Sequence, residues 1–199
     1  SFPTRRSSDL MLVSLIFTLV IATPLGILAA VKQNSAIDCV IRCLTFVGNS
    51  LPNFFAALIL IYFFVLKFSL LPLISKSSVS GVILPALTLS IAMGAKYTRQ
   101  IRALTLEELN KPYVTGERAR GVGEFNILSK SVLKSVLPTI ITLVALSMGS
   151  LLGGAAIVET IFMWDGVGKL AVDAILMRDY PIVLAYALFM SVTYAVVNL

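Results

Sequence analysis

Residues 111–125, KPYVTGERARGVGEF, form a charged stretch punctuated by glycines in a mainly apolar chain. The stretch combines the phenol of Tyr113, the carboxylate of Glu117 and the guanidinium groups of Arg118 and Arg120. These groups can make a mixed aromatic and charged contact with a partner, or they can simply form a solvated basic loop. The residues alone leave both interpretations open.

Catalysis and metal binding find little support elsewhere in the chain. The sequence has no histidine, no pair of carboxylates within an apolar run and no G-x-x-x-x-G-K-[ST] nucleotide-binding motif. Cys39 and Cys43 share a helix face, but no other ligand-type residue nearby completes a metal set. We expect the two cysteines to be small packing residues, and we predict no catalytic residue, metal site or cofactor.

The rest of the chain contains five long runs without charged residues, and these runs must form the elements that hold the charged stretch in place. The chain has 199 residues, of which 58% are hydrophobic and 13% charged, with a mean hydropathy of +0.95. A helix of about 20 apolar residues crosses the hydrocarbon core of a bilayer, so we predict an all-α polytopic membrane protein with five transmembrane helices. The weakest is the third, which opens with serines and could instead lie in the membrane interface. The charge-free runs are Leu10–Val31, Cys43–Leu66, Ser77–Ala95, Ser135–Val158 and Tyr180–Leu199.

Basic residues predict the orientation of the spans. Eight Lys or Arg residues lie in 96–134, whereas 159–180 contains two, together with four acidic residues. The positive-inside rule places the more basic loop in the cytoplasm. We therefore predict a multi-pass protein of the cell (plasma or inner) membrane, with a cytoplasmic loop at 96–134 and an extracytoplasmic loop at 159–180.

The cytoplasmic loop contains a predicted short helix. Asn110 is a possible N-cap and Pro112 suits a first helical turn. A two-turn helix is predicted over Tyr113–Arg120, and Gly121 and Gly123 are expected to stop it. Such a helix stands out from the membrane instead of being buried in it.

The spans carry one packing motif and few charges. Gly149 and Gly153 form a G-x-x-x-G that Gly154 extends, and small residues at this spacing let helix backbones approach closely. This face either packs against another helix, of this chain or of another subunit, or has no particular partner. Four of the five spans contain no ionisable carboxylate, amine or guanidinium group, so any transport is expected to take its energy from elsewhere.

Two motifs are similar to those of a known family. The segment YVTGERARGVGEFNILSKSVLKSVLP resembles the cytoplasmic signature loop of binding-protein-dependent ABC importer permeases. Residues 115–117 stand where that family has Glu-Ala-Ala, and Gly121 stands where it has a glycine. Residues 151–181 resemble the last extracytoplasmic region of the permeases for dipeptides, oligopeptides and nickel, although Asp165 replaces a common proline.

The resemblance implies an ABC importer permease fold with six spans in a full-length member. The chain is therefore expected to lack sequence at both ends. Residues 1–10 match nothing in the family, so we expect them to be non-native or disordered, the alternative being a short basic tail beside the membrane. Residues 11–199 would form the transmembrane domain.

The function that the resemblance implies is that of a permease subunit, not of an enzyme. It would form the path for di- or oligopeptides, or for nickel or metal chelates, by alternating access. The implied partners are a second permease subunit, cytoplasmic ATP-binding subunits, an extracytoplasmic solute-binding protein and the lipid bilayer, but no nucleic acid. Rival hypotheses are a secondary transporter and a membrane structural or assembly protein.

The resemblance assigns a site for the ATPase but none for the substrate. A helix that couples the spans to the ATPase is expected at 113–121, while the residues of a substrate path stay unassigned. The coupling residues are Tyr113, Thr115, Gly116, Glu117, Arg118, Ala119, Arg120 and Gly121.

Overall fold

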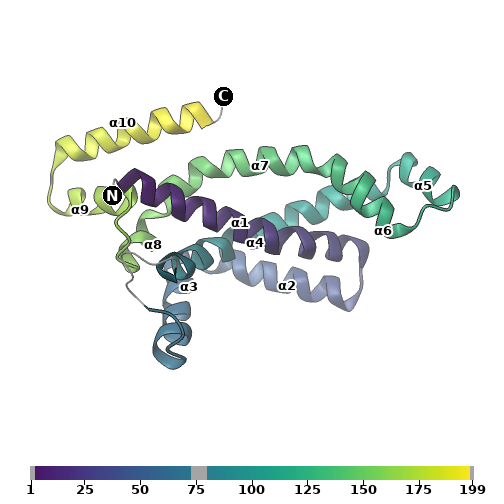
Figure 1. Ribbon diagram of the computed structural model, residues 1–199, viewed down its shortest axis with the longest axis horizontal. Helices are drawn as coiled ribbons and strands as arrows, with labels where there is room; N and C mark the ends of the chain where they lie inside the picture. The colour runs from purple at the N-terminus through teal and green to yellow at the C-terminus, as the bar shows by residue number, and fades with distance from the viewer. Residues whose placement is uncertain (1–2, 73–79, 198–199) are drawn as a thin grey trace. The chain divides into compact units, whose positions relative to one another are not determined.

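The computed structural model describes residues 3–72 and 80–197, and these residues form helices and connections without any strand (Figure 1). The predicted all-α fold is therefore confirmed over the described ranges. Two helices, labelled η, have π-type hydrogen bonding. The helices are α1 (Pro3–Val31), α2 (Ala36–Ser50), α3 (Asn53–Leu60), η1 (Ile61–Lys67), α4 (Ser80–Leu109), α5 (Pro112–Ala119), α6 (Glu124–Asn126), η2 (Ile127–Val132), α7 (Leu133–Gly154), α8 (Ala156–Ile161), α9 (Val167–Leu176) and α10 (Tyr180–Val197).

Apolar helices occur in each of the five regions where spans were predicted. Within the described ranges, three helices are long and apolar enough to cross a membrane: Thr4–Val31, Gly81–Leu109 and Glu124–Met148. A fourth span results if Ala36–Ser50 and Asn53–Lys67, which break before Pro52, are taken together. In the fifth region, Tyr180–Val196 is apolar over a shorter length.

The third predicted span extends further than its charge-free run. Its expected start at Ser77 lies outside the described residues, but α4 continues from Ser80 past Ala95 to Leu109. The charged residues after Ala95 therefore belong to the same helix as the apolar ones. The basic segment begins on a helix that continues the span, and the loop proper starts only after Leu109.

The chain divides into two compact units. Unit 1 comprises Ser1–Phe17, Leu51–Ala92 and Ala145–Leu199, and unit 2 comprises Thr18–Ser50 and Met93–Val144. Within unit 1, α9 packs against α8 and α10, and α8 also contacts α3.

Unit 2 has its core where α1, α4, α5, η2 and α7 meet. Gly26 of α1 marks the closest approach, because a Cβ built on it would lie 2.8 Å from the Cβ of Ile101 on α4. Tyr97 is almost completely buried in this core, and its hydroxyl donates to the Leu143 carbonyl at 2.8 Å. The buried members of the core are Ala22, Tyr97, Ile101, Val114, Ile127, Val132, Val136 and Ile140.

Residues 3–10 form the first turns of α1. Their assignment as non-native stays a prediction.

Candidate functional site

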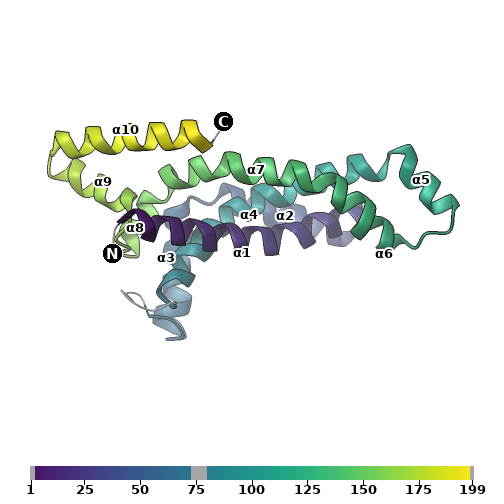
Figure 2. The same cartoon turned by 45° about the horizontal axis from the view of Figure 1, so that its top comes forward.

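The short helix predicted for this loop is present as α5, in the chain segment between the end of α4 and the start of α6 (Figure 2). Pro112 occupies its first turn, where the missing N–H costs nothing and the fixed φ suits a helix. The N-cap is Lys111, not Asn110, so that part of the prediction is wrong. Asn110 instead donates its side-chain amide to the Leu106 carbonyl at 2.9 Å, and it thereby belongs to the end of α4.

Gly121 ends α5 as predicted. Its φ of 80° lies in the left-handed region, which a residue with a Cβ adopts only at a cost. The Gly121 N–H donates to the Arg118 carbonyl at 3.0 Å, and the Val122 N–H donates to the Glu117 carbonyl at 3.1 Å. These two bonds are the 5→2 and 6→1 pair of a Schellman motif, which satisfies the last carbonyls of a helix. Gly123 has an extended conformation at the N-cap of α6, where the next helix begins.

Three contacts fix α5 to the rest of unit 2. Val114 is fully buried in the core of the unit. The hydroxyl of Tyr113 donates to Glu108 Oε2 at 2.9 Å, and the Ser131 hydroxyl reaches both carboxylate oxygens of Glu117, at 2.8 and 2.9 Å. Burial, followed by this donation to Glu108, raises the pKa of the Tyr113 hydroxyl, which therefore stays protonated as a donor at neutral pH. The helix is held at its start, its middle and its end.

The opposite face of α5 is exposed. Thr115, Gly116, Ala119 and Arg120 all point to solvent, and a Cβ on Gly116 would meet no atom within 4 Å. Arg118 is also exposed and forms an ion pair with Glu124 across the turn, with Nε and Oε1 at 2.6 Å. The arrangement is a short, fixed helix whose exposed face carries small side chains and two guanidinium groups.

A buried ion pair that sequence reasoning missed lies on other elements of unit 2. Asp38, in the first turn of α2, is 0% exposed. Arg102 of α4 binds it with both arms, since Nε lies 2.7 Å from Oδ1 and Nη2 lies 2.8 Å from Oδ2. The backbone N–H of Asn34 donates to Oδ2 at 3.0 Å, and the more exposed Arg42 lies 3.5 Å from Oδ1.

The Asp38–Arg102 pair ties three pieces of the chain together: the turn after α1, the start of α2 and the charged half of α4. Two-armed binding of a carboxylate by arginine fixes orientation as well as distance. Seven residues after Arg102, α4 ends, and α5 follows. The one sequence signal near this pair was the pattern Ser35-x-x-Asp38, which is typical of a helix start. In the structure, the Ser35 hydroxyl accepts a hydrogen bond from the Asp38 N–H at 3.4 Å.

The second motif region, in unit 1, is organised around Glu159 of α8. This carboxylate is 1% exposed, and its Oε2 accepts from the backbone N–H of Lys169 at 2.9 Å, in the first turn of α9. A Cβ on Gly166 would overlap the carboxylate, and one on Gly168 would lie 2.9 Å from Oε2 and 2.7 Å from the Cα of Ala156. The G-x-G of the motif thus leaves the space through which a buried acid reaches the N-terminus of a helix.

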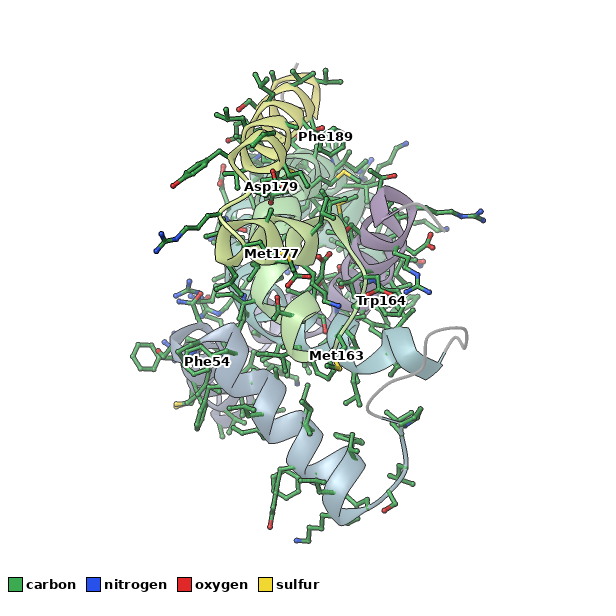
Figure 3. The ribbon with its side chains drawn as sticks, turned by 90° about the vertical axis from the view of Figure 1, so that its left-hand side faces the viewer. Phe54, Met163, Trp164, Met177, Asp179 and Phe189 are labelled. Atoms are coloured by element: carbon green, nitrogen blue, oxygen red, sulfur yellow. The ribbon has the colours of Figure 1, made fainter. Side chains whose placement is uncertain are left out.

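The connection between α8 and α9 is tightly turned. Met163 has a φ of 50°, and the Trp164 N–H donates to the Glu159 carbonyl at 2.8 Å. Met163 and Met177 lie on either side of α9 in the sequence, and their side chains are mostly exposed (Figure 3). This loop has apolar groups at its surface and a charged group inside.

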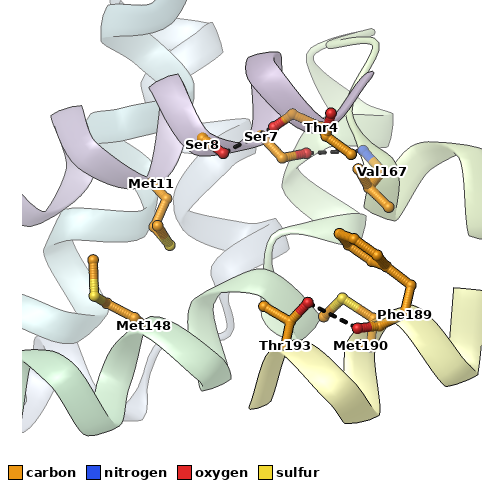
Figure 4. Close-up of a pocket in the computed structure, with 9 residues that line it drawn as sticks. All are labelled: Thr4, Ser7, Ser8, Met11, Met148, Val167, Phe189, Met190 and Thr193. Atoms are coloured by element: carbon orange, nitrogen blue, oxygen red, sulfur yellow. Dashed lines mark hydrogen bonds between the residues drawn. The ribbon is translucent and has the colours of Figure 1, made fainter. Parts of the chain in front are cut away.

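The N-terminal turns of α1 also meet this region. The Ser7 hydroxyl donates to Glu159 Oε1 at 2.8 Å and accepts from the Val167 N–H at 2.8 Å, as Figure 4 shows for the second bond. Beside it lies a cavity of about 180 Å³ with Met11, Met148 and Phe189 in its wall.

The remaining sequence predictions concern the glycine motif, the two cysteines and a metal site. Gly149, Gly153 and Gly154 lie outside the residues whose surroundings the structure describes, so their packing role stays a prediction. Cys39 and Cys43 have exposed side chains instead of being packed within the chain. In the part of the chain that the structure describes, no three His, Cys, Asp or Glu residues gather as a metal site would require.

The comparisons with known proteins agree with this geometry. A family model described as "Binding-protein-dependent transport system inner membrane component" matches residues 22–199. The oligopeptide transport system permease protein AppB of Bacillus subtilis (strain 168) is 37% identical over 200 residues, covering 96% of this chain and 63% of that protein. The glutathione transport system permease protein GsiC of Escherichia coli (strain K12) is 34% identical over 190 residues, covering 96% and 62%.

A solved structure shows the same fold. An inward-facing form of the MetNI methionine ABC transporter contains a chain that superposes with a TM-score of 0.84 at 16% sequence identity. The superposition covers 98% of this chain and 89% of that one. At this identity the likeness bears on the fold alone, and it confirms the ABC importer permease fold.

These observations define a multi-pass α-helical protein of the inner membrane. The chain belongs to the family of binding-protein-dependent transport system inner membrane components. It spans a little over three fifths of the length of the two curated relatives, 63% and 62%.

Proposed function

We propose that the chain is part of a permease subunit of an ATP-driven importer and forms part of the path for peptides. The names of the two relatives, for oligopeptides and for the tripeptide glutathione, support peptides as the substrate class over nickel or metal chelates. The partners are a second permease subunit, cytoplasmic ATP-binding subunits and an extracytoplasmic solute-binding protein.

The single observation that carries this proposal is the construction of α5. A helix of eight residues is too short to be stable alone in water, so its order comes from tertiary contacts such as those of Val114, Tyr113 and Glu117. With one face fixed and the other exposed, α5 is suited to transmit a push from a partner. The partner is the ATP-binding subunit, and the push drives alternating access by rigid movement of the helices.

The proposal requires that α5 faces the cytoplasm. The excess of basic residues in 96–134 over 159–180 supports this orientation. With Cys39 and Cys43 replaced by serine, we expect Ser129→Cys and Asp173→Cys to be labelled from opposite sides of the membrane. Labelling of both positions by an impermeant thiol reagent added outside intact cells would overturn the orientation.

Coupling is tested by Gly121→Val and Glu117→Lys in the assembled transporter. A β-branched residue at a φ of 80° costs about 1–2 kcal/mol and redirects the end of α5. Lysine at position 117 loses the bond from Ser131 and reverses a charge at the exposed rim. We expect normal membrane insertion, loss of peptide uptake, and ATP hydrolysis that loaded binding protein no longer stimulates.

The matched control is Gly123→Ala, which changes a nearby glycine with a φ of −64° and open space around its Cβ position. This variant should take up peptide at nearly the normal rate. Normal uptake by Gly121→Val at wild-type expression would show that α5 is only a solvated connector, and the coupling proposal would be wrong.

A further inference from the structure

A basic groove runs along η2 and the start of α7, on the side of the helix that faces away from the core of unit 2. Its wall has a regular spacing: Ser129, Leu133 and Leu137 follow one another at four-residue intervals, and Lys130 and Lys134 do the same. Along this wall, Leu133 lies between the two lysines, and Leu137 follows Lys134 toward the apolar run.

The two sides of this helix differ in what they contact. Val132 and Val136 are 2% and 3% exposed and belong to the core, which fixes the rotation of the helix. Lys130 and Lys134 are exposed, and Leu137 is 47% exposed. The lysines are therefore held outward by packing on the opposite face.

Neither lysine has an acidic partner among the described residues. Both are absent from the ion pairs of the described chain, and the sequence has no Asp or Glu from 125 to 158. The nearest acid before them, Glu124, is engaged by Arg118. Side chains four apart on a helix lie about 5–6 Å apart at their Cβ atoms, so both ammonium groups can reach one phosphodiester.

The position of the groove along the span identifies the occupant. Lys134 is the last charged residue before the apolar run 135–158, and η2 and α7 belong to the candidate span Glu124–Met148. In a bilayer this places the lysines at the level of the lipid headgroups and Leu137 at the level of the upper acyl chains. Basic pockets at this level on the cytoplasmic side bind anionic headgroups.

We propose that the groove formed by Ser129, Lys130, Leu133, Lys134 and Leu137 is a binding site for an anionic phospholipid of the cytoplasmic leaflet. The two ammonium groups hold the headgroup phosphate, the Ser129 side chain lines the polar end, and an acyl chain begins beside Leu137. The π-type hydrogen bonding of η2 coincides with the polar end of the groove, and such turns occur frequently at functional sites. The inference rests on the membrane placement of α7 and is independent of whether α5 couples to an ATPase.

The first test measures lipid retention. The full chain, in the complex in which it is purified, is reconstituted in bilayers of phosphatidylglycerol and phosphatidylcholine, and the lipids that remain bound in detergent are counted by native mass spectrometry. The double variant Lys130→Gln/Lys134→Gln should retain roughly 30-fold less phosphatidylglycerol, because each lysine near an anionic surface contributes about a factor of five. Lys130→Arg/Lys134→Arg should retain it.

The matched control removes the same charge elsewhere. Lys32→Gln/Lys96→Gln alters two exposed lysines that also border predicted spans but lie outside the groove. The general attraction to an anionic surface falls in this variant too, but retention of a lipid bound in detergent should fall much less than in the groove variant. An equal loss in this control, or no preference for phosphatidylglycerol in the wild type, would overturn the proposal. All four side chains are exposed, so equal thermal stability of the variants is expected and serves as the check on folding.

The second test locates the lipid and separates it from a small anion. Phosphatidylglycerol with a photoreactive group near the top of one acyl chain should crosslink to the peptide that contains Leu133 and Leu137. Unlabelled phosphatidylglycerol should compete, whereas inorganic phosphate at the same excess should not. Competition by inorganic phosphate, or crosslinks spread evenly over the apolar helices, would overturn the assignment to a lipid.

Discussion

Among the described residues, unit 1 and unit 2 each bury one carboxylate, and they compensate for it by different means. Asp38 in unit 2 is held by a charged side chain, because both arms of Arg102 bind it. Glu159 in unit 1 is held by neutral groups, the backbone N–H of Lys169 at the start of α9 and the Ser7 hydroxyl, and Gly166 and Gly168 make room for it. A buried charge without a partner is costly to fold. Only the Asp38 arrangement avoids this cost by means of a second charged residue.

Because the two carboxylates are stabilised differently, different substitutions disrupt them. A guanidinium partner can be lost through a single substitution, which leaves a charge buried without compensation. A backbone N–H cannot be removed by any substitution except proline, so the Glu159 arrangement is vulnerable through the space around it instead. The charge pair fixes α2 to α4, whereas the Glu159 arrangement fixes α8 to the neighbouring α9.

The largest expected effect is that of Arg102→Ala. Removal of one partner from a buried ion pair typically costs about 3–5 kcal/mol of folding free energy, and Asp38 is fully buried. The free energy of unfolding, measured by denaturant titration in mild detergent, should fall by this amount. Arg42→Ala is the control and should change it little, because Arg42 is half exposed and lies 3.5 Å from Asp38. Equal effects of the two variants would show that the carboxylate is solvated.

The next prediction compares the two buried acids after each is replaced by the amide of the same shape. Asp38→Asn leaves the Arg102 guanidinium partly buried without its counter-charge, and we expect a loss of about 2–3 kcal/mol, in the upper range for hydrogen bonds to charged groups. Glu159→Gln keeps a carbonyl oxygen for the Lys169 N–H, so a loss of about 1 kcal/mol or less is expected. Thermal unfolding of the two variants side by side gives the order. The opposite order would mean that the charge of Glu159, not its hydrogen bonds, holds α9.

The last prediction tests the space around Glu159. Gly166→Ala places a methyl group where the carboxylate lies, and overpacking of this kind costs about 1–3 kcal/mol. Combining Gly166→Ala with Glu159→Ser should cost less than the sum of the single changes, because the shorter side chain vacates the space. Gly168→Ala should show no such relief, since the Cα of Ala156 also blocks its Cβ. Additive effects at position 166 would argue that α8 and α9 separate instead.

Much of the fold could be predicted because hydrophobic runs and basic loops follow directly from membrane physics. The end of α5 was equally accessible, since Gly121 has local consequences that need no tertiary context. The Asp38–Arg102 pair was not accessible, because its members are 64 residues apart in the chain and only the packing of α2 on α4 brings them together. The role of the glycines at 166 and 168 was hidden for the same reason: the motif was visible, but the side chain that fills the space between them was not.

The link between α4 and α5 consists only of Asn110 and Lys111. Two residues extend over about 7 Å at most, and here the side-chain amide of Asn110 is bonded back to Leu106, which shortens the free length further. A joint this short limits how far the end of α4 and the start of α5 can move apart, so a displacement of α5 cannot be taken up by slack chain. When α5 is displaced, either the end of α4 follows or the joint itself bends.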